Sequence, residues 1–513
     1  MLPVATAAEM RALDAATIRD VGLPGAVLME TAGRAVAAAA RAALGGAGGR
    51  VAVVCGGGNN GGDGFVAARV LRAAGVDAWV HLVAPRPSIG GDARTFLDAY
   101  ERSGGVLAEV ATDDQLVELS EALARAAVVV DAVFGTGLTR AVEGRLAGVI
   151  ERINAAPGVR IAVDIPSGLS ADTGHPLGVA VRADRTVTMG LPKVGLVTSP
   201  GFAWAGVVEV AEIGIPRALI DAGGAHAAVI EAADVEAWRP RADPVDHKGR
   251  RGHLLVVAGS PGKRGAGRLS ATAALRSGAG LCTLAGPAGP AGELVAPDAV
   301  MTAPLASASE LRALAAGKAA IAIGPGMPEG ELGRTWVDAV LAAGLPAVID
   351  ATGLTHLAGA STSLSMSGLR SVAGAAGPVV LTPHPGEAGR LLGTTAAAIE
   401  ADRLAAVRQL ATTARAVVVL KGARTLICDG TLADDFVWIN PTGGPALATG
   451  GTGDVLTGVI GALLAQGLPA VTAARLGVWV HGRAGEALAT RYGARGVVAS
   501  DLPDAVAGVL ASA

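Results

Sequence analysis

Short apolar segments that end in glycine or a polar side chain, each followed by a helical pattern, recur along this chain of 513 residues. The first covers 50–55 and leads into a glycine-rich turn at 56–64, after which helical spacing resumes at Phe65. A strand, a glycine-rich turn and a helix in this order are typical of doubly wound nucleotide-binding folds. The pattern therefore predicts an α/β architecture in which helices pack on buried strands.

The length of the chain exceeds what one ordinary hydrophobic core supports, and it predicts at least two domains. Hydrophobic residues make up 51% of the chain and charged residues only 17%, which provides enough apolar material for large cores. Proline, glycine and charged residues cluster at 216–240 and indicate a boundary there. We predict a first domain at 1–215, a linker at 216–240 and a second domain at 241–513.

Charge, aromatic content and cysteine spacing argue against several classes of protein. The formal net charge of −3 and the aromatic content of 3% give no basis for a nucleic-acid surface. Cys55, Cys282 and Cys428 are too far apart in sequence to indicate a disulfide framework or a cysteine zinc site. The N-terminal segment lacks the features of a secretory signal, and no apolar stretch reaches membrane-spanning length. We expect a soluble cytoplasmic protein that binds neither nucleic acid nor membrane.

Acidic residues stand at the ends of predicted strands in the first half. Asp63, Asp131 and Asp164 each lie at or just after such an end, with Arg140 and Ser167 close to them in sequence. In open α/β sheets the ligand crevice lies outside the carboxyl ends of the strands. Any one of these acids could cap a helix, but three carboxylates and an arginine at one edge favour a ligand site.

The glycine-rich turn at 56–64 departs from the GxGxxG fingerprint of hydride-transfer enzymes, because Asn59, Asn60 and Asp63 interrupt it. Their side-chain oxygens could hold a cation or a ribose. The two asparagines could instead be left-handed turn residues. Lys193 lies beside the same predicted edge, where it could act as an acid or base or form an exposed loop tip.

A set of motifs in the first half resembles the N-terminal domain of the YjeF family, the NAD(P)H-hydrate epimerases. The matching segments are 9–14, 28–33, Asn59-Asn60-Gly61-Gly62-Asp63-Gly64, 131–137 and Asp164-Ile165-Pro166-Ser167-Gly168. The resemblance covers about residues 5–215 and implies a Rossmann-like, doubly wound, three-layer domain. That family interconverts the R and S forms of hydrated, damaged NAD(P)H at the nicotinamide carbon that bears the hydroxyl group.

The resemblance also implies roles for individual residues. Potassium ligands would be Asn60, Asp131 and Ser167, and oxygen ligands suit such a hard cation. Contacts to the hydrate would come from Asn59, Asn60, Gly61, Gly62, Asp63, Gly135, Thr136, Gly137, Leu138, Thr139, Arg140, Ala141 and Asp164. Asp164 is the candidate catalytic acid or base, with Lys193 as its candidate partner.

The second half contains a run of small residues, 443–453, that leads to the lone carboxylate of Asp454 and then to an apolar helical pattern. Glycines let backbone N–H groups approach a ligand closely, and the start of a helix adds a positive dipole end. The segment therefore predicts an anion cradle in which Asp454 could take a proton from a hydroxyl group. The alternative is a glycine-rich turn in which Asp454 caps the helix.

Two other side chains at strand ends of the second half point toward a ligand. His384 lies between two prolines after the strand that begins at 379, and it is either a core or turn histidine or a ligand contact. Its place at a strand end, level with the other loops, favours the ligand contact. Lys421 directly follows four apolar residues, and its charge would be costly if it were buried without a partner. A nucleotide phosphate would compensate that charge.

The second half resembles the ribokinase-like superfamily and, more closely, the YjeF C-terminal domain, the ADP/ATP-dependent NAD(P)H-hydrate dehydratases. The matching segments are His247-Lys248-Gly249, Gly252-His253, 382–387, Lys421-Gly422 and 448–454. They extend over about residues 240–510 and imply a ribokinase-like α/β domain. Two positions depart from the family: Met327 replaces the usual leucine, and Thr352 stands where another acid often follows Asp350-Ala351. Because of Thr352 we assign Asp350 no role.

By this resemblance the hydrate would contact Ala266, Gly326, His384 and Asp454. The adenine nucleotide would contact Lys421, Gly422, Ala423, Arg424, Thr425 and Gly453. Asp454 would accept the hydroxyl proton of the hydrate while ADP or ATP phosphorylates that oxygen, and elimination of phosphate would then restore NAD(P)H. We expect Mg²⁺ to assist, ADP to be preferred, and the chain to form a homo-oligomer, a tetramer or larger.

Three hypotheses follow for the whole chain. The first is a fused repair enzyme, in which the first half epimerises the hydrate and the second half dehydrates its S form. The second is a small-molecule kinase of the ribokinase type with an appended binding domain, which leaves the asparagine-rich turn unexplained. The third is a nucleotide-binding scaffold without catalytic activity. We favour the first, because a dehydratase that accepts one epimer needs an epimerase beside it.

Overall fold

In the computed structural model the chain divides into two units, Pro3–Ala227 and Ala228–Ala513, with Met1–Leu2 counted in the second. The structure describes residues 1–45, 48–241, 243–288, 294–359 and 365–512. The division falls inside the segment 216–240, which the sequence predicts as a linker. That segment contains α9 (Arg217–Ala222), β9 (Ala227–Val229) and α10 (Ala232–Trp238).

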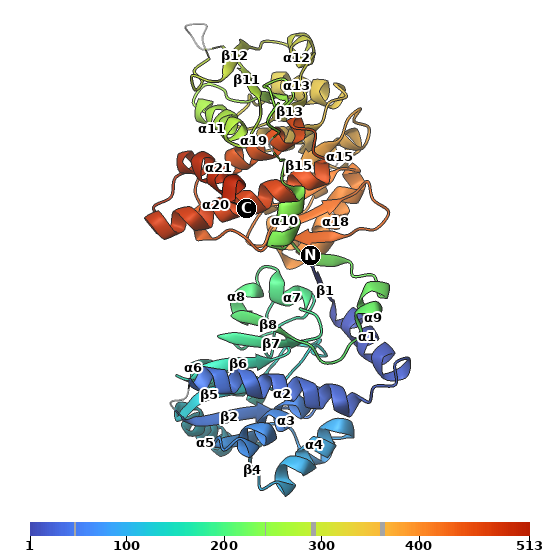
Figure 1. Ribbon diagram of the computed structural model, residues 1–513, viewed down its shortest axis with the longest axis vertical. Coiled ribbons are helices and arrows are strands. Elements are labelled where there is room, and N and C mark those ends of the chain that lie inside the picture. Colours follow the sequence, from blue (N-terminus) through green and yellow to red (C-terminus); the bar gives the residue numbers. More distant parts are fainter. Residues whose placement is uncertain (46–47, 242, 289–293, 360–364, 513) are drawn as a thin grey trace. The chain divides into compact units, whose positions relative to one another are not determined.

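The first unit is built on a parallel sheet with the strand order β4-β3-β2-β5-β6-β7-β8 (Figure 1). Its strands are β2 (Arg50–Cys55), β3 (Ala78–Leu82), β4 (Val106–Glu109), β5 (Ala126–Ala132), β6 (Val159–Val163), β7 (Arg185–Met189) and β8 (Val207–Ala211). The chain runs outward from β2 to β4 and then returns to β5 on the other side of β2, as in doubly wound dinucleotide-binding folds. Ligands in such folds bind at this switch point, between the carboxyl ends of β2 and β5.

Helices cover both faces of this sheet, because successive residues of a strand point to opposite sides. Val51, Val53 and Cys55 pack in one core cluster with residues of α2, α3 and α4. Ala52 and Val54 pack in another cluster with residues of α5 and α6. The helices of this unit include α1 (Ala7–Arg19), α2 (Gly25–Leu44), α3 (Asn59–Ala73), α4 (Gly91–Arg102), α5 (Asp113–Ala124), α6 (Gly144–Ala155), α7 (Val194–Val197) and α8 (Phe202–Ala205). The predicted three-layer α/β fold is confirmed.

The second unit contains a larger sheet, in which β10 to β18 follow the order β18-β17-β16-β15-β14-β13-β10-β11-β12. These strands are β10 (His253–Val257), β11 (Leu281–Gly286), β12 (Met301–Pro304), β13 (Ala320–Ile323), β14 (Ala347–Ile349), β15 (Val379–Leu381), β16 (Val417–Leu420), β17 (Leu426–Asp429) and β18 (Val437–Ile439). The pairs from β12 to β16 are parallel, and β17 is antiparallel to both of its neighbours. The carboxyl ends of β10, β13, β14, β15 and β16 therefore lie in a row along one edge, with the switch point between β10 and β13.

Leu254, Val256 and Ala258 share a core cluster with residues of α11 (Arg264–Arg276), α19 (Thr452–Ala465) and α20 (Ala470–Tyr492). Nearly all of α19 is buried, which explains why its sequence is apolar on every side. Other helices are α12 (Ala308–Ala315), α13 (Glu331–Leu341), α14 (Thr352–Ala358), α15 (Ser365–Ala373), α16 (Pro385–Leu392), α17 (Ala396–Ala401), α18 (Arg403–Ala414) and α21 (Leu502–Ser512). Within the described residues, no helix combines the length and the apolar character needed to cross a bilayer.

Candidate active sites

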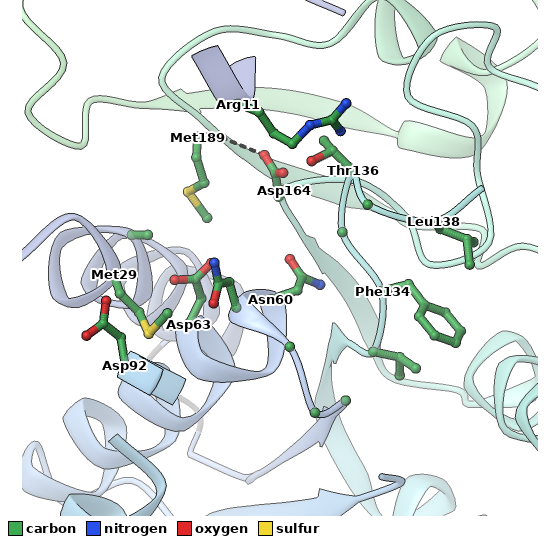
Figure 2. Close-up of a pocket in the computed structure, with 18 of the residues that line it drawn as sticks. Arg11, Met29, Asn60, Asp63, Asp92, Phe134, Thr136, Leu138, Asp164 and Met189 are labelled. Carbon is green, nitrogen blue, oxygen red and sulfur yellow. Dashed lines mark hydrogen bonds between the residues drawn. The ribbon is translucent and has the colours of Figure 1, made fainter. Parts of the chain in front are cut away.

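The first site is a cavity of about 750 Å³ at the switch point of the first unit (Figure 2). Its wall includes Asn59, Asn60 and Asp63 from α3, the segment 133–140 after β5, and Asp164 after β6. Lys193, which follows β7, also lies on this wall. The structure thus brings together most of the residues that the sequence places in the first site.

Gly61, Gly62 and Ala141 are predicted hydrate contacts that do not lie on the cavity wall. A Cβ on Gly61 would stand 2.1 Å from the carbonyl oxygen of Gly56, and one on Gly62 would stand 2.5 Å from Sδ of Met29. These two glycines therefore allow α3 to pack closely against its neighbours. They do not line the cavity, but their close packing positions the residues of α3 that do.

Asp164 and Lys193 form a buried ion pair at the edge of the cavity. Asp164 adopts a left-handed backbone conformation, with φ of 66°, and its Oδ1 accepts bonds from Met189 N at 3.0 Å, Thr188 Oγ1 at 3.3 Å and Lys193 Nζ. Lys193 is fully buried and also donates to Thr188 Oγ1 at 3.0 Å and to the carbonyl oxygen of Met189 at 2.8 Å. The alternative of an exposed lysine at a loop tip is therefore wrong.

Two further carboxyl groups of the cavity wall have perturbed acidity. Burial, together with the charges of Asp164 and Asp14, raises the pKa of Asp63 well above its ordinary value. Burial raises the pKa of Asp14, on α1, to about 6. Sequence reasoning used Asp14 only as part of a motif and gave it no place in the site. Its position on the first helix, far from the other residues in sequence, left no local signal of this proximity.

Asp131 and Ser167 meet at the ends of β5 and β6. Ser167 donates to Asp131 through Oγ at 2.6 Å and through its backbone N–H at 2.8 Å, while Phe134 N donates to Ser167 Oγ at 2.8 Å. Asp131 is fully buried, and burial raises its pKa to about 6. No cationic side chain among the described residues pairs with it. A buried carboxylate without a cation fits a site for a bound positive ion.

Asn60 lies close to this group. Its Nδ2 is buried without a hydrogen-bond partner among the described residues, and a Cβ on Gly135 would stand 3.2 Å from its Oδ1. Gly135 directly follows Phe134, which contacts Ser167. Carboxylate, amide and hydroxyl oxygens are the donors that a hard cation prefers. The chemistry of Asn60, Asp131 and Ser167 therefore fits the potassium ligands implied by the resemblance.

The second site is organised around the N-terminus of α19. Gly451, with φ of 92°, is the N-cap of this helix, and Asp454 lies in its first turn. The alternative in which Asp454 caps the helix is therefore wrong. Burial, with a contribution from Asp350, raises the pKa of Asp454 to about 6. This carboxyl group is partly buried and close to the end of β14, as a base in a ligand site requires.

Lys421 pairs with Asp350 rather than lacking a partner within the protein. Its Nζ donates to Asp350 Oδ1 at 2.5 Å and lies 3.8 Å from Glu387 Oε2. Thr457 Oγ1 donates to the other oxygen of Asp350 at 2.8 Å. Burial alone would lower the pKa of Lys421, but Asp350 and Glu387 raise it above its ordinary value. Asp350 already compensates this charge, so the position of Lys421 does not by itself require a nucleotide phosphate.

Asp350 is thus a central residue to which sequence reasoning assigned no role. The departure from the family at Thr352 obscured the role of Asp350. Its place at the end of a buried strand, like that of Lys421, could nevertheless have indicated a site residue. A Cβ on Gly453 would stand 3.5 Å from Lys421 Nζ and 3.6 Å from Asp350 Oδ2. The start of α19 and the ends of β14 and β16 therefore meet at one place.

His384 caps the helix that follows it, which agrees with the turn alternative that the sequence left open. Its Nδ1 accepts hydrogen bonds from the backbone N–H groups of Gly386 at 3.0 Å and Glu387 at 3.3 Å, so that it caps α16. Glu387 accepts in return from the backbone N–H of His384. Burial and the charge of Lys421 lower the pKa of His384. The imidazole is about half exposed, and its Nε2 lies 3.6 Å from Oε1 of Glu387.

The remaining predicted residues form two turns at the same edge. Gly326 has φ of 59°, and a Cβ on it would stand 3.1 Å from Cβ of Ala266, so these two hydrate candidates are neighbours. In the turn after Lys421, Thr425 Oγ1 donates to the carbonyl oxygen of Gly422 at 2.9 Å, and Arg424 donates to that of Pro441 at 2.6 Å. Ala423 is exposed in this turn.

Two buried side chains that the sequence did not single out hold the start of the turn at Lys421 and the first residue of α19. Arg403 donates to the carbonyl oxygens of Leu420 at 3.3 Å and Lys421 at 3.4 Å. His481 lies 2.9 Å from the carbonyl oxygen of Thr452, and burial lowers its pKa to about 4. Both lie on helices far along the chain from the segments they support, which is why local patterns did not reveal them.

The two units match two different protein families. Residues 25–195 match the family described as YjeF-related protein N-terminus, and residues 254–507 match the family described as NAD(P)H-hydrate dehydratase. The chain is 43% identical to the bifunctional NAD(P)H-hydrate repair enzyme Nnr of Moorella thermoacetica, over 97% of this chain and 95% of that protein. The chain belongs to the family of bifunctional NAD(P)H-hydrate repair enzymes. The family prediction made from the motifs is confirmed for both halves.

Other similar proteins carry related descriptions. The bifunctional NAD(P)H-hydrate repair enzyme Nnr of Escherichia coli K12 is 35% identical, over 86% of this chain and 81% of that protein. Among solved structures, the ADP/ATP-dependent NAD(P)H-hydrate dehydratase from Bacillus subtilis, co-crystallized with ATP/Mg²⁺, is 32% identical. It covers 55% of this chain and 96% of its own, with a TM-score of 0.47.

Proposed function

We propose that this chain repairs hydrated NAD(P)H in two steps, with epimerisation in the first unit and ADP- or ATP-dependent dehydration in the second. Its membership in the family of bifunctional repair enzymes supports this function. One observation carries the proposal: each unit holds its own largely buried lysine–aspartate pair at the ligand edge of its own sheet. A kinase with a mere binding domain would need no such pair in the first unit.

For the epimerase site, we propose Asp164 as an acid or base, anchored by Lys193. The cavity volume of about 750 Å³ lies within the usual range for sites that bind small molecules and cofactors. The N-terminus of α3 provides backbone N–H groups and a positive dipole end for the phosphates of the hydrate. The segment 135–140 and the side chains of Asn59 and Asp63 would contact the rest of the molecule.

We also propose that Asn60, Asp131 and Ser167 hold a potassium ion in the first unit. When bound, the ion would supply a positive charge next to the fully buried carboxylate of Asp131. Because Ser167 also bonds the backbone of Phe134, these residues would hold the 135–140 loop against the cavity. The chain's own residues would then orient the hydrate, with the chemistry at Asp164.

For the dehydratase site, we propose that Asp454 takes the proton of the hydrate's hydroxyl group while the nucleotide transfers a phosphoryl group to that oxygen. Phosphate is a much better leaving group than hydroxide, so its elimination restores NAD(P)H. The N-terminus of α19 and the ammonium of Lys421 would stabilise the charge on the phosphoryl group. Residues 421–425 and Gly453 would contact the nucleotide, and Ala266, Gly326 and His384 the hydrate.

Mg²⁺ fits this site as a companion of the nucleotide. The described residues contain no cluster of three or more acidic, cysteine or histidine side chains that could enclose a metal. Mg²⁺ in nucleotide sites is commonly held by only one or two carboxylates together with the substrate phosphates. Asp454 and Asp350, whose charge contributes to the raised pKa of Asp454, provide two such groups. Mg²⁺ would supply additional positive charge to the phosphates.

A coupled assay tests the proposed function. Chemically hydrated NADH, containing both epimers, is incubated with the enzyme, Mg²⁺ and either ADP or ATP, and the NADH absorbance is followed. We expect complete recovery for the wild type and recovery of only the S fraction for Asp164→Ala. An absence of recovery with both nucleotides would overturn the proposal. Accumulation of a stable phosphorylated product would instead support the kinase hypothesis.

We further propose a cytoplasmic homo-oligomer, a tetramer or larger, on the family resemblance alone. Light scattering of the purified chain measures the molar mass and tests the assembly.

A further inference from the structure

Epimerisation of the hydrate requires proton transfers at the hydroxyl-bearing carbon, and the inference drawn here rests on that proposed function. The reduced nicotinamide ring is an enamine, so water adds to the ring carbon next to the nitrogen and leaves a hydroxyl group there. Inverting that carbon by loss and return of water needs two proton transfers on opposite faces. One group must give a proton to the departing oxygen, and another must take a proton from the arriving water. The site therefore needs an acid and a base on different walls.

Asp63 has the properties of the acid. It lies in the first turns of α3 on the cavity wall and is only 9% exposed. No described residue makes a hydrogen bond or an ion pair with its carboxyl group. Burial and the neighbouring charges of Asp164 and Asp14 raise its pKa, which favours the protonated form. An unpaired carboxyl group with a retained proton is a suitable general acid.

Asp164 has the properties of the base, and it enters the same cavity from another element. Figure 2 shows Asp63 on the helix side of the cavity and Asp164 at the strand end across from it. All the bonds to Asp164 from Lys193, Thr188 and Met189 reach Oδ1. Its Oδ2 receives none from the described residues and can accept a proton. Lys193 itself uses its three donors on Asp164, Thr188 and Met189, so it serves as the anchor.

We propose that Asp63 and Asp164 are an acid–base pair acting on the two faces of the hydrated ring. Asp63 gives its proton to the hydroxyl oxygen, the C–O bond breaks with its electron pair on the departing water, and the nitrogen lone pair forms a C=N bond. A water molecule on the other face then adds to that carbon and loses a proton to Asp164. Asp63 is now ionised and Asp164 protonated, which is the starting state for the reverse inversion.

Other charged groups share the cavity wall and define what surrounds this pair. They are Arg11, Asp14, Asp92, Arg140 and Arg145. Arg145 donates to the carbonyl oxygens of Val83 and Val110, which holds it on the wall. Asp14 contributes to the raised pKa of Asp63, so it is a positioning residue that helps Asp63 keep its proton.

An isotope experiment tests the bond that breaks. The wild type is incubated with one purified epimer in H₂¹⁸O without nucleotide, so that the second unit cannot remove the label, and a sample without enzyme gives the background. We expect each inversion to introduce one ¹⁸O atom at the hydroxyl group. Inversion with retention of the original oxygen, as in a ring-opening route, would overturn the proposal.

Substitution of Asp63 tests the assignment of the acid. We expect Asp63→Asn to slow epimerisation in both directions by about 10²- to 10⁴-fold, while dehydration of the S epimer by the second unit is unchanged. Asp98→Asn is the control, because Asp98 pairs with Arg94 on α4 outside the cavity. Asp63→Glu, which keeps a titratable acid, should restore part of the activity and shift the high-pH limb of the rate profile.

The outcomes separate this inference from the proposed function. A wild type that does not epimerise at all would overturn the proposed function itself. A wild type that epimerises while Asp63→Asn retains activity within about threefold, well below a general-acid effect, would overturn only the acid–base pair. Thermal unfolding checks the fold of Asp63→Asn; if that variant unfolds early, a Glu variant that is folded but inactive at every pH overturns the assignment.

Discussion

At the scale of single residues, both sites depend on a non-glycine residue in a left-handed conformation at a strand end. Asp164 itself has φ of 66°, and Ala351, which follows Asp350, has φ of 48°. Such conformations cost of order 1–3 kcal/mol and persist where surrounding contacts enforce them. A Cβ on Gly324 would stand 1.8 Å from the carbonyl oxygen of Asp350, so the neighbouring turn fits tightly around this residue. In both units, backbone geometry thus fixes a carboxylate at the ligand edge.

Asp454 should give dehydration a characteristic pH dependence. Its pKa of about 6 means that the base is ionised above pH 6 and becomes protonated as the pH falls through that value. We expect the rate of dehydration of the S epimer to be constant well above pH 6 and to fall about tenfold per unit well below it. Asp454→Asn should lower the rate about 10²- to 10⁴-fold above pH 6, remove the fall in rate below pH 6, and leave epimerisation unchanged. A variant that keeps the wild-type profile would contradict the assignment.

The pair of Lys421 and Asp350 should be strongly coupled in stability. Lys421→Met leaves the nearly fully buried carboxylate of Asp350 without its cation, and we expect a loss of about 3 kcal/mol in the free energy of unfolding, measured with urea. The double variant Lys421→Met, Asp350→Asn should recover part of that loss, because neither charge then remains. Asp504→Asn, which breaks an exposed pair with Arg276, should change stability by less than about 1 kcal/mol. If the losses in unfolding free energy of Lys421→Met and Asp350→Asn simply add in the double variant, the two side chains are not coupled.

Residue-scale predictability depended on whether the signal was local. The glycine-rich segment before Asp454 and the acids at strand ends can be recognised in sequence, because each lies beside the turn that positions it. The cap formed by His384 is also local, because it uses the backbone N–H groups of Gly386 and Glu387. The partners of Lys421 could not be predicted in this way. Asp350 lies 71 residues from Lys421 in sequence, and their contact arises only when β14 and β16 enter the same sheet.

At the scale of elements, the N-terminus of α19 depends on Gly451. Its φ of 92° disfavours any side chain, and a Cβ there would stand 2.7 Å from Cδ1 of Leu269 and 3.1 Å from Cβ of Ala499. We expect Gly451→Ala to lower both the thermal stability of the second unit and its dehydration rate. Gly467→Ala is a matched control, because Gly467 has φ of 88° and nothing lies within 4 Å of its Cβ position.

The comparison of these two variants separates the backbone strain of a left-handed alanine from the crowding of its Cβ by neighbouring side chains. Both carry the backbone cost of a left-handed alanine, about 1 kcal/mol. Only Gly451→Ala also crowds the side chains of Leu269 and Ala499. Equal melting temperatures and equal activities for the two variants would show that close packing at Gly451 does not shape the cradle.

The thermal stability of the first unit should depend on potassium, because the proposed ligands lie on α3 and just after or within β5 and β6. If Asn60, Asp131 and Ser167 hold this ion, its binding stabilises the first unit by an amount that grows with concentration. We expect the melting temperature to rise as KCl replaces choline chloride at constant ionic strength. Asp131→Asn should abolish that rise, whereas Asp184→Asn, an exposed partner of Arg160, should preserve it. A rise that persists in Asp131→Asn would place the ion elsewhere.

Element prediction was best where the hydrophobic pattern was unbroken. The strand predicted at 50–55 is observed at those residues, because β2 is buried on both faces and bounded by a glycine-rich turn. β4 was not predicted: it is a short edge strand whose residues are half-buried or exposed, so it lacks a clear apolar signal. The helix of the asparagine-rich turn begins at Asn59 rather than after the motif, since α3 continues through Gly61, Gly62 and Gly64 despite their low helix propensity.

At the scale of the whole molecule, the two units place carboxylates in a ligand site by similar means, although their sheets differ. Each has a carboxylate at the carboxyl end of a parallel strand near a switch point, and each pairs that carboxylate with a lysine that is fully or largely buried. The sequence could predict this division, since both halves repeat the pattern of strand, glycine-rich turn and helix. It could not place the boundary within the 216–240 segment, where short elements belong to either unit.

Because each candidate site is complete within one unit, the two activities should be separable in trans. We expect a mixture of Asp164→Ala and Asp454→Asn chains to repair R-hydrated NADH completely, since one variant supplies epimerisation and the other supplies dehydration. Either variant alone should fail on the pure R epimer, apart from the uncatalysed background. With the enzyme in excess, the rate for the mixture should approach that of the wild type at the same concentration of each active site. A mixture that repairs far more slowly than the wild type would show that the hydrate passes between the sites of one chain or assembly without entering bulk solution.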